Sequence, residues 1–443
     1  MTEEGSLWRR ALRAVAVDVG LLRRRRELGL LVGGQTVSLA GSMITEVALA
    51  FQMYALTGSS LAVGLLGAAQ FVPLLLLAVV GGALADAFDR RRLVGLAEAG
   101  SAVAAAALVA NALLAEPQVW PLYACGALMA GLSAVGRPPL DALVPRLVAR
   151  DELKAAAALR TVTSNAAFVG GPALGGVLIA TAGLGATYAV DFASFAASLG
   201  ALAAMRTPAG GWAAADAEPP SLRSVREGLR YARSRQDLVG TYLVDMNAMF
   251  FGMPMALFPA ISQRYGGAEV LGAMYAAPAA GSLGAALTSG WARHVHRHGR
   301  AVALAAAGWG AAIVLFGLAD ALWLALACLA VAGGMDAVSG VFRTTMWNET
   351  IPDRLRGRLA GLEMISFSSG PLLGDTEAGA AAALAGVRAS VISGGVLCVA
   401  GTALLALALP RFWRYDAREA PPGGAAGDAP GRPPAPPPAR AIE

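Results

Sequence analysis

Long apolar stretches separated by short polar segments run through almost the whole chain. Residues 61–84 and 391–409, for example, are predominantly apolar over more than about 18 positions, which is enough for a helix to cross a bilayer. The stretches are rich in alanine, leucine and glycine and lack period-two alternation, so they predict helices and not barrel strands. Breaking the pattern at polar residues, glycine and proline predicts twelve spans: 28–56, 61–85, 93–115, 119–144, 155–180, 184–205, 238–261, 270–291, 301–319, 322–346, 359–384 and 389–409.

The longest internal polar segment divides these spans six and six. The sequence therefore predicts an all-α membrane protein with twelve transmembrane helices in two six-helix bundles. Within the connecting segment, Leu222, Val225 and Leu229 recur at helical spacing among arginines, which fits a helix on the membrane surface or, equally, a solvated linker helix. The predicted parts are a cytoplasmic N-terminal segment (1–27), an N-terminal bundle (28–205), a linker with an amphipathic helix (206–237), a C-terminal bundle (238–409) and a disordered cytoplasmic tail (410–443).

Composition supports a membrane protein and excludes several other classes. The 443 residues are 56% hydrophobic and 15% charged, whereas soluble domains average about 45–50% apolar and about 25% charged residues. The net charge of +5 is spread between the spans and not gathered on one face, so no nucleic-acid partner is expected. The three cysteines lie inside apolar runs, and the HVHRH tract is a polar turn beside arginines, so no metal site and no cofactor are expected. No GKS or GKT motif is present, which argues against an ATP-driven pump.

The positive charges predict the orientation of the chain. Lysines and arginines gather in alternate polar segments, such as residues 90–92 and 354–358, while the intervening loops carry only Arg264 and Arg388. Because loops rich in lysine and arginine remain on the cytoplasmic side, both termini are expected to be cytoplasmic. A cleavable signal peptide is not expected, because the arginine-rich start has no short apolar region followed by a cleavage site. These observations predict a multi-pass protein of the plasma membrane.

The two halves share a partial repeat. The fourth span ends with GRPPLDALVP and the fifth contains GGPALGG, while the tenth ends with FRTTMWNETIP and the eleventh contains SGPLLGD. Arg137 precedes Pro145 by eight residues, and Arg343 precedes Pro352 by nine. This parallel order fits halves related by an axis along the membrane normal, an arrangement in which the substrate site lies between the halves.

The segment GGALADAFDRRR at the end of the second span resembles the signature loop of the major facilitator superfamily. Gly82, Asp86, Arg90 and Arg91 carry the resemblance, while Asp89 stands where a second glycine is usual, as in the enterobactin-exporter branch. The resemblance implies a conformational latch in which Asp86 and Arg90 meet the start of the eleventh span. The arginines also fit a simpler role, in which their positive charge only fixes the orientation of the chain in the membrane, and the two roles are compatible.

The two glycine–proline motifs are predicted to let helices approach closely, because glycine lacks a side chain and proline can bend a helix. The first of them also resembles a motif associated with exporters in the superfamily. The residues assigned to helix packing are Gly171, Pro172, Gly175, Gly370, Pro371 and Gly374.

Acidic residues within spans are the candidates for proton or substrate binding, because charges inside a bilayer are costly and are usually functional. A carboxyl group withdrawn from water holds a proton more tightly, so it can take a proton on one side and release it on the other. The alternative for each is a helix-packing hydrogen bond or an ion pair with Arg137, Arg160 or Arg343. Of seven acids in the spans, which include Asp191 and Glu363, the assigned candidates are Glu46, Asp245, Asp336, Asp375 and Glu377.

The sequence thus predicts a secondary active exporter of an amphipathic small molecule, either a siderophore or a drug-like compound, in exchange for protons. A proton-coupled importer of a small nutrient is the alternative. An intramembrane enzyme is disfavoured, because no span contains a histidine. The expected partners are the small-molecule substrate, protons and membrane lipid, and the protein is expected to act as a monomer.

Overall fold

The computed structural model describes residues 20–206, 230–231, 233–351 and 353–418, without the side chains of residues 79–83, 85–87 and 353–368. The described chain is helical and contains no strand. Residues 221–229 and 232 of the predicted surface helix, which spans 221–235, fall outside these residues. The N-terminal half consists of α2 (Gly20–Arg24), α3 (Arg26–Thr57), α4 (Ser60–Ala87), α5 (Arg90–Ala112), α6 (Trp120–Leu143), η1 (Val144–Arg146), η2 (Arg150–Glu152) and α7 (Leu153–Ala204).

The C-terminal half begins two residues before the predicted bundle boundary and contains one interrupted span. It consists of α9 (Gln236–Phe251), η3 (Met255–Leu257), α10 (Phe258–Ser262), α11 (Ala268–Leu287), η4 (Ser289–His294), α12 (His298–Leu318), α13 (Leu322–Thr350), α14 (Asp353–Ala385), α15 (Val387–Ala408) and α16 (Pro410–Trp413).

Twelve crossings are present, as the hydrophobic pattern predicts. Nine helical segments of the described residues are long and apolar enough to cross a membrane, and α9, η3 and α10 form one of them. A second crossing is contained in α7, because Gly183 at φ 80° occupies a conformation that favours glycine and turns the helix. The remaining two are α6 and α14, with 24 and 33 residues.

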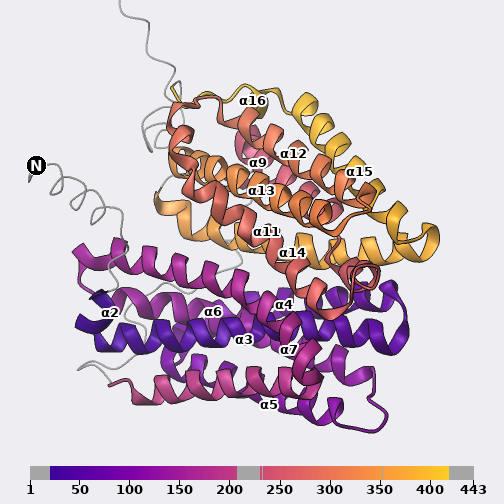
Figure 1. Ribbon diagram of the computed structural model, residues 1–443. Coiled ribbons are helices and arrows are strands. Elements are labelled where there is room, and N and C mark those ends of the chain that lie inside the picture. The colour runs from indigo at the N-terminus through magenta and orange to yellow at the C-terminus, as the bar shows by residue number, and fades with distance from the viewer. Residues whose placement is uncertain (1–19, 207–229, 232, 352, 419–443) are drawn as a thin grey trace, which may run out of the picture.

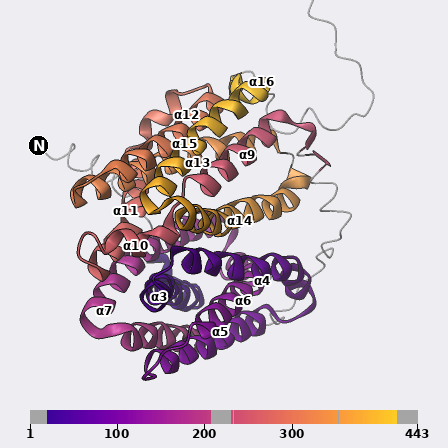
Figure 2. The same cartoon turned by 90° about the vertical axis from the view of Figure 1, so that its right-hand side faces the viewer.

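The two halves form two layers of helices (Figures 1 and 2). We name the end at which α3 begins at Arg26 and α5 begins at Arg90 the basic end, and the end that carries the turns at Gly58, Gly183 and Gly386 the far end. The layers meet mainly through two helix pairs, α4 with α14 and α7 with α11, with smaller contacts of α3 with α10 and α11 and of α4 with η3. Each pair joins one helix from each half, so movement of one bundle against the other must change both contacts.

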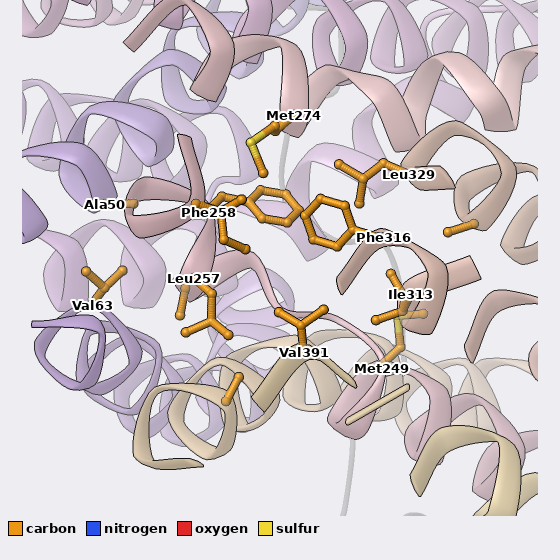
Figure 3. Packing of buried hydrophobic residues seen from close by; sticks show 14 of the residues in the cluster. Ala50, Val63, Met249, Leu257, Phe258, Met274, Ile313, Phe316, Leu329 and Val391 are labelled. Carbon is orange, nitrogen blue, oxygen red and sulfur yellow. The ribbon is translucent and has the colours of Figure 1, made fainter. Parts of the chain in front are cut away.

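The largest hydrophobic core extends across the boundary between the halves. Figure 3 shows Leu257 and Phe258 of the C-terminal half near Ala50 and Val63 of the N-terminal half, and all four belong to the same buried cluster. The ring of Phe258 meets that of Phe316 edge to face at 5.9 Å. The far part of the interrupted span is therefore packed against both halves.

Residues 410–418, which the sequence analysis assigned to the tail, pack on the C-terminal bundle. Phe412 is fully buried against Gly240 and Gly299, and the Tyr415 hydroxyl donates a hydrogen bond of 2.9 Å to Glu349. The aromatic residues explain this difference, since they supply the apolar surface that the composition of the following segment lacks. Residues 419–443 lie outside the described part of the chain.

Candidate functional site

A buried ion cluster in the C-terminal half combines three of the charged residues identified within spans. Arg343 on α13 pairs through Nη1 with Asp245 on α9, and its Nη2 lies 3.3 Å from Oδ1 of Asp336. The Arg343 and Asp245 side chains are 9% and 8% exposed, whereas that of Asp336 is 35% exposed. Two carboxylates thus share one guanidinium, and Asp336 is the more exposed of the two.

The N-terminal half contains a cavity of about 410 Å³. It extends from Leu31 and Val144, near the basic end, to Glu46 and Gln70 in the middle of their helices. Leu372 of α14 contributes to the wall, so the cavity reaches the other half. Glu46 is exposed although it lies mid-span, because its side chain faces this space. Glu46 is thus an acidic group on the wall of the cavity.

Two further acids are held by short polar side chains inside the N-terminal bundle. The Thr45 hydroxyl donates a 2.6 Å hydrogen bond to the fully buried Asp191, and Ser194 donates another of 3.1 Å. Glu98 on α5 accepts hydrogen bonds of 3.0 Å from both Gln35 and Ser38 on α3. These contacts fasten α3 to α5 and to the second arm of α7. Glu98 also lines the cavity, a role that its position near the end of a span did not suggest.

The seventh crossing is interrupted between α9 and η3, and side chains from three other helices satisfy the exposed backbone groups. The Gly252 carbonyl accepts a hydrogen bond of 2.7 Å from Trp309 Nε1, and the Met255 carbonyl accepts one of 3.2 Å from the Tyr275 hydroxyl. The Ala256 N–H donates a 2.8 Å hydrogen bond to Oδ1 of Asp375 on α14. Unsatisfied backbone groups are costly in a membrane, so these partners stabilise the break. The sequence signal was FGMP, in which glycine and proline stand close together mid-span.

Glycines allow the two halves to touch near the far end. A Cβ atom added at Gly64 on α4 would lie 2.4 Å from the Asp375 carbonyl oxygen, and one at Gly176 on α7 would lie 2.6 Å from Gly272 Cα on α11. Thr376 adds a cross-half hydrogen bond of 2.9 Å to the Gly64 carbonyl. We name these two glycine contacts and the Thr376 bond the far seal.

The two glycine–proline motifs occupy equivalent places in the two halves. Gly171 and Gly175 on α7 face α3, where added Cβ atoms would lie 2.6 Å from Met43 and 3.3 Å from Ile44. Gly370 and Gly374 on α14 face α9 in the same way, at 2.7 Å from the Met249 side chain and 2.5 Å from the Phe250 carbonyl oxygen. Pro172 and Pro371 lie inside α7 and α14. The fifth span thus packs on the first as the eleventh packs on the seventh.

The predicted latch, which also includes Gly82, is described only in part, because the side chain of Asp86 lies outside the description. Arg90 begins α5, and Arg91 Nη2 donates a 3.0 Å hydrogen bond to the Ala203 carbonyl near the end of α7. Asp89, the departure from the usual glycine, accepts a 3.0 Å hydrogen bond from the Arg92 N–H and so caps α5. The acidic residue therefore has a structural role at the helix start.

Of the remaining predicted acids, some have partners in the structure and others do not have a described contact. Glu377 is half-buried on α14, two residues beyond Asp375, and the side chain of Glu363 is not described. Glu46 and Asp375 come from opposite halves, on α3 and α14. Asp245 and Asp336 meet at Arg343, which sequence reasoning treated as one of three alternative partners. The spacing of Asp336 and Arg343, two helical turns apart, was the signal that could have paired them.

Two six-helix bundles that meet through paired helices, with charged groups buried within each bundle, define a transporter of the major facilitator type. A family model described as a transmembrane secretion effector matches residues 30–422. The chain therefore belongs to the transmembrane secretion effector family of the major facilitator superfamily.

Relatives and solved structures agree with this assignment. The chain is 31% identical to the Enterobactin exporter EntS of Shigella boydii serotype 18 and to that of Escherichia coli O1:K1, over 89% of this chain and 94% of each relative. In fold it is similar to a POT family transporter solved with 5-aminolevulinic acid (TM-score 0.70, 10% identity, 88% and 97% of the two chains). It is also similar to an inward-facing bacterial homologue of the lysosomal transporter Spinster (TM-score 0.64, 16% identity, 88% and 96%). The protein is a multi-pass membrane transporter of small molecules.

Proposed function

We propose that this transporter is a secondary active exporter of an amphipathic small molecule, of siderophore or drug-like type, that works by alternating access in exchange for protons. The observation that carries the direction is the similarity to enterobactin exporters across nearly the full length of both chains. The cavity, whose wall combines acids with apolar residues such as Phe168 and Leu372, fits an amphipathic cargo.

The distribution of arginines supports an orientation with the basic end in the cytoplasm, because loops rich in positive charge remain on the cytoplasmic side of the membrane. In that orientation the cavity extends toward the cytoplasmic side while the far seal closes the outer side. A cargo collected from the cytoplasm would then leave after the bundles rock and the far seal opens. The predicted latch of Asp86 and Arg90 would stabilise the opposite, outward-open state.

Proton coupling is assigned to acids that water can reach. Glu46 faces the cavity, and Asp336 is the accessible member of the Arg343 cluster, so these two are the foremost candidates. Protonation of Asp336 would leave Arg343 paired with the buried Asp245. Uptake of one proton would therefore remove the excess negative charge of two carboxylates on one guanidinium and leave a neutral pair, which is less costly inside the membrane.

Comparing the medium of cells with and without the protein by mass spectrometry tests this function. We expect one or more amphipathic molecules to accumulate outside only in cells that contain the protein, and a protonophore to remove the difference. Accumulation of a nutrient inside the cells would instead establish the alternative, a proton-coupled importer. Export that persists unchanged after the proton gradient collapses would contradict the antiport mechanism.

A further inference from the structure

Asp375 on α14 is the residue at which the far seal meets the interrupted seventh crossing. Its carbonyl oxygen is the atom that Gly64 of α4 approaches, and its side chain accepts the hydrogen bond from Ala256 at the start of the far part of the seventh crossing. The next residue, Thr376, donates its hydroxyl to the Gly64 carbonyl. One turn of α14 therefore contacts both the opposite half and the interrupted span.

The far part of the seventh crossing is separated from α9 at Gly252 and Pro254, so it is not held in place by a continuous helix. Its residues Leu257 and Phe258 pack in the core that both halves share (Figure 3). Trp309 and Tyr275 bond to carbonyl groups at the break, and the helices that carry them belong to the same half. The Asp375 bond differs from the Trp309 bond, because it joins the break to α14, which forms the seal with α4. Tyr275 lies on α11, which forms the seal with α7.

From this geometry we infer that Asp375 is a positioning residue of the outer gate. Its hydrogen bond holds the far part of the seventh crossing against α14 and thereby favours the closed far seal. This role requires an acceptor at Oδ1 and does not require a negative charge or a proton that moves. It adds a gating function to the proposed alternating-access cycle and rests on that proposal.

Asparagine distinguishes this role from proton carriage, because its side-chain oxygen can accept the same hydrogen bond but cannot carry a charge. Replacement by alanine or by leucine removes the hydrogen-bond acceptor. Two variants of different size are used so that the test remains possible if one of them fails to fold. Spin labels at Leu113 on the N-terminal half and Leu384 on the C-terminal half report the far-end separation, since both side chains are exposed at that end, at 73% and 90%. The distance distribution is measured by pulsed electron spin resonance on the full chain, without cargo or proton gradient.

We expect Asp375→Ala and Asp375→Leu to raise the ratio of the open to the closed far-end distance by up to roughly tenfold, the order expected for loss of one intramolecular hydrogen bond. Asp375→Asn should retain the wild-type distribution. Trp309→Phe, which removes a different hydrogen bond from the same break, should lower the melting temperature without lengthening the distance. An unchanged distance in both the alanine and leucine variants, or an equal lengthening in the asparagine or Trp309 variant, would overturn the assignment.

The readout is independent of transport. Absence of export in the medium comparison would contradict the proposed function while leaving the distance result intact. An unaltered distance would remove the gate role from Asp375 while leaving export untouched.

Discussion

Arg343 and Asp336 lie two helical turns apart on α13, with a guanidinium nitrogen 3.3 Å from a carboxylate oxygen. The same guanidinium also pairs with Asp245 on α9, which is much less exposed. The arginine therefore has one deeply buried partner and one accessible partner. Each carboxylate is expected to serve a different purpose, Asp245 for the stability of the bundle and Asp336 for coupling.

Replacing Asp336 by asparagine tests the coupling role. Asp336→Asn should abolish proton-driven efflux while expression remains normal, because Arg343 keeps its bond to Asp245. Efflux from vesicles under an imposed proton gradient measures the effect. Asp320→Asn is the matched control, since Asp320 has an 87% exposed side chain on a far-end loop. Normal efflux in the Asp336 variant would remove that residue from the proton pathway.

Removing the arginine tests the structural role of the same cluster. Arg343→Met should leave Asp245 buried beside no positive partner, and breaking a buried pair in this way costs about 3–5 kcal/mol in soluble proteins. The melting temperature in detergent should fall, and it should recover when Asp245→Leu is added, because the pair is then replaced by apolar groups. Arg160→Met is the control: Arg160 pairs with the half-exposed Asp141, and exposed pairs contribute about 0–1 kcal/mol. A double variant no more stable than Arg343→Met would contradict this account.

The number of spans and the division into two bundles were predictable because each crossing must bury a run of apolar side chains about 20 residues long. The family was predictable from GGALADAFDRRR, and the family model confirms it. The partners of the acids were not predictable in the same way. That Asp375 bonds to Ala256, or that Glu98 meets Gln35 and Ser38, depends on the rotation of each helix about its axis.

Hydrophobicity carries little information about helix rotation in a membrane, because lipid and the bundle interior are both apolar. Small residues were a better guide: apart from Gly170, the glycines of GGPALGG and SGPLLGD lie where helices approach closely. The break in the seventh crossing had its own signal in Gly252 and Pro254, but the residues that stabilise it come from α11, α12 and α14. Such partners, distant in sequence, become apparent only once the helices are placed.

The latch implied by the superfamily resemblance has a kinetic test. Asp86→Asn should slow the turnover of cargo more than it weakens cargo binding, because a latch biases the two conformations and does not contact the cargo. Initial efflux rates over a range of cargo concentrations separate these effects. Asp89→Asn is the control, since asparagine caps a helix about as well as aspartate and should leave α5 intact. An unchanged maximal rate in the Asp86 variant would contradict the latch.

Adding a methyl group at the far seal should shift the equilibrium from the closed toward the open far end without changing any charge. In Gly64→Ala the added methyl group would lie 2.4 Å from the Asp375 carbonyl oxygen and 3.2 Å from Gly379 Cα, both backbone atoms that cannot rotate away. Contact this close requires α4 and α14 to separate. The variant should therefore populate the longer distance between spin labels at Leu113 and Leu384.

Gly33→Ala is the matched control for this substitution, because it also adds a methyl group to a glycine within a span but meets no atom within 4 Å. Alanine is the better helix former by about 1 kcal/mol, so Gly33→Ala should leave the distance unchanged and the melting temperature equal or higher. Adding Thr376→Val to Gly64→Ala should lengthen the distance further, since it removes the hydrogen bond that crosses the same contact. A wild-type distance distribution in Gly64→Ala would mean that the close contact of α4 with α14 does not set the separation of the two bundles.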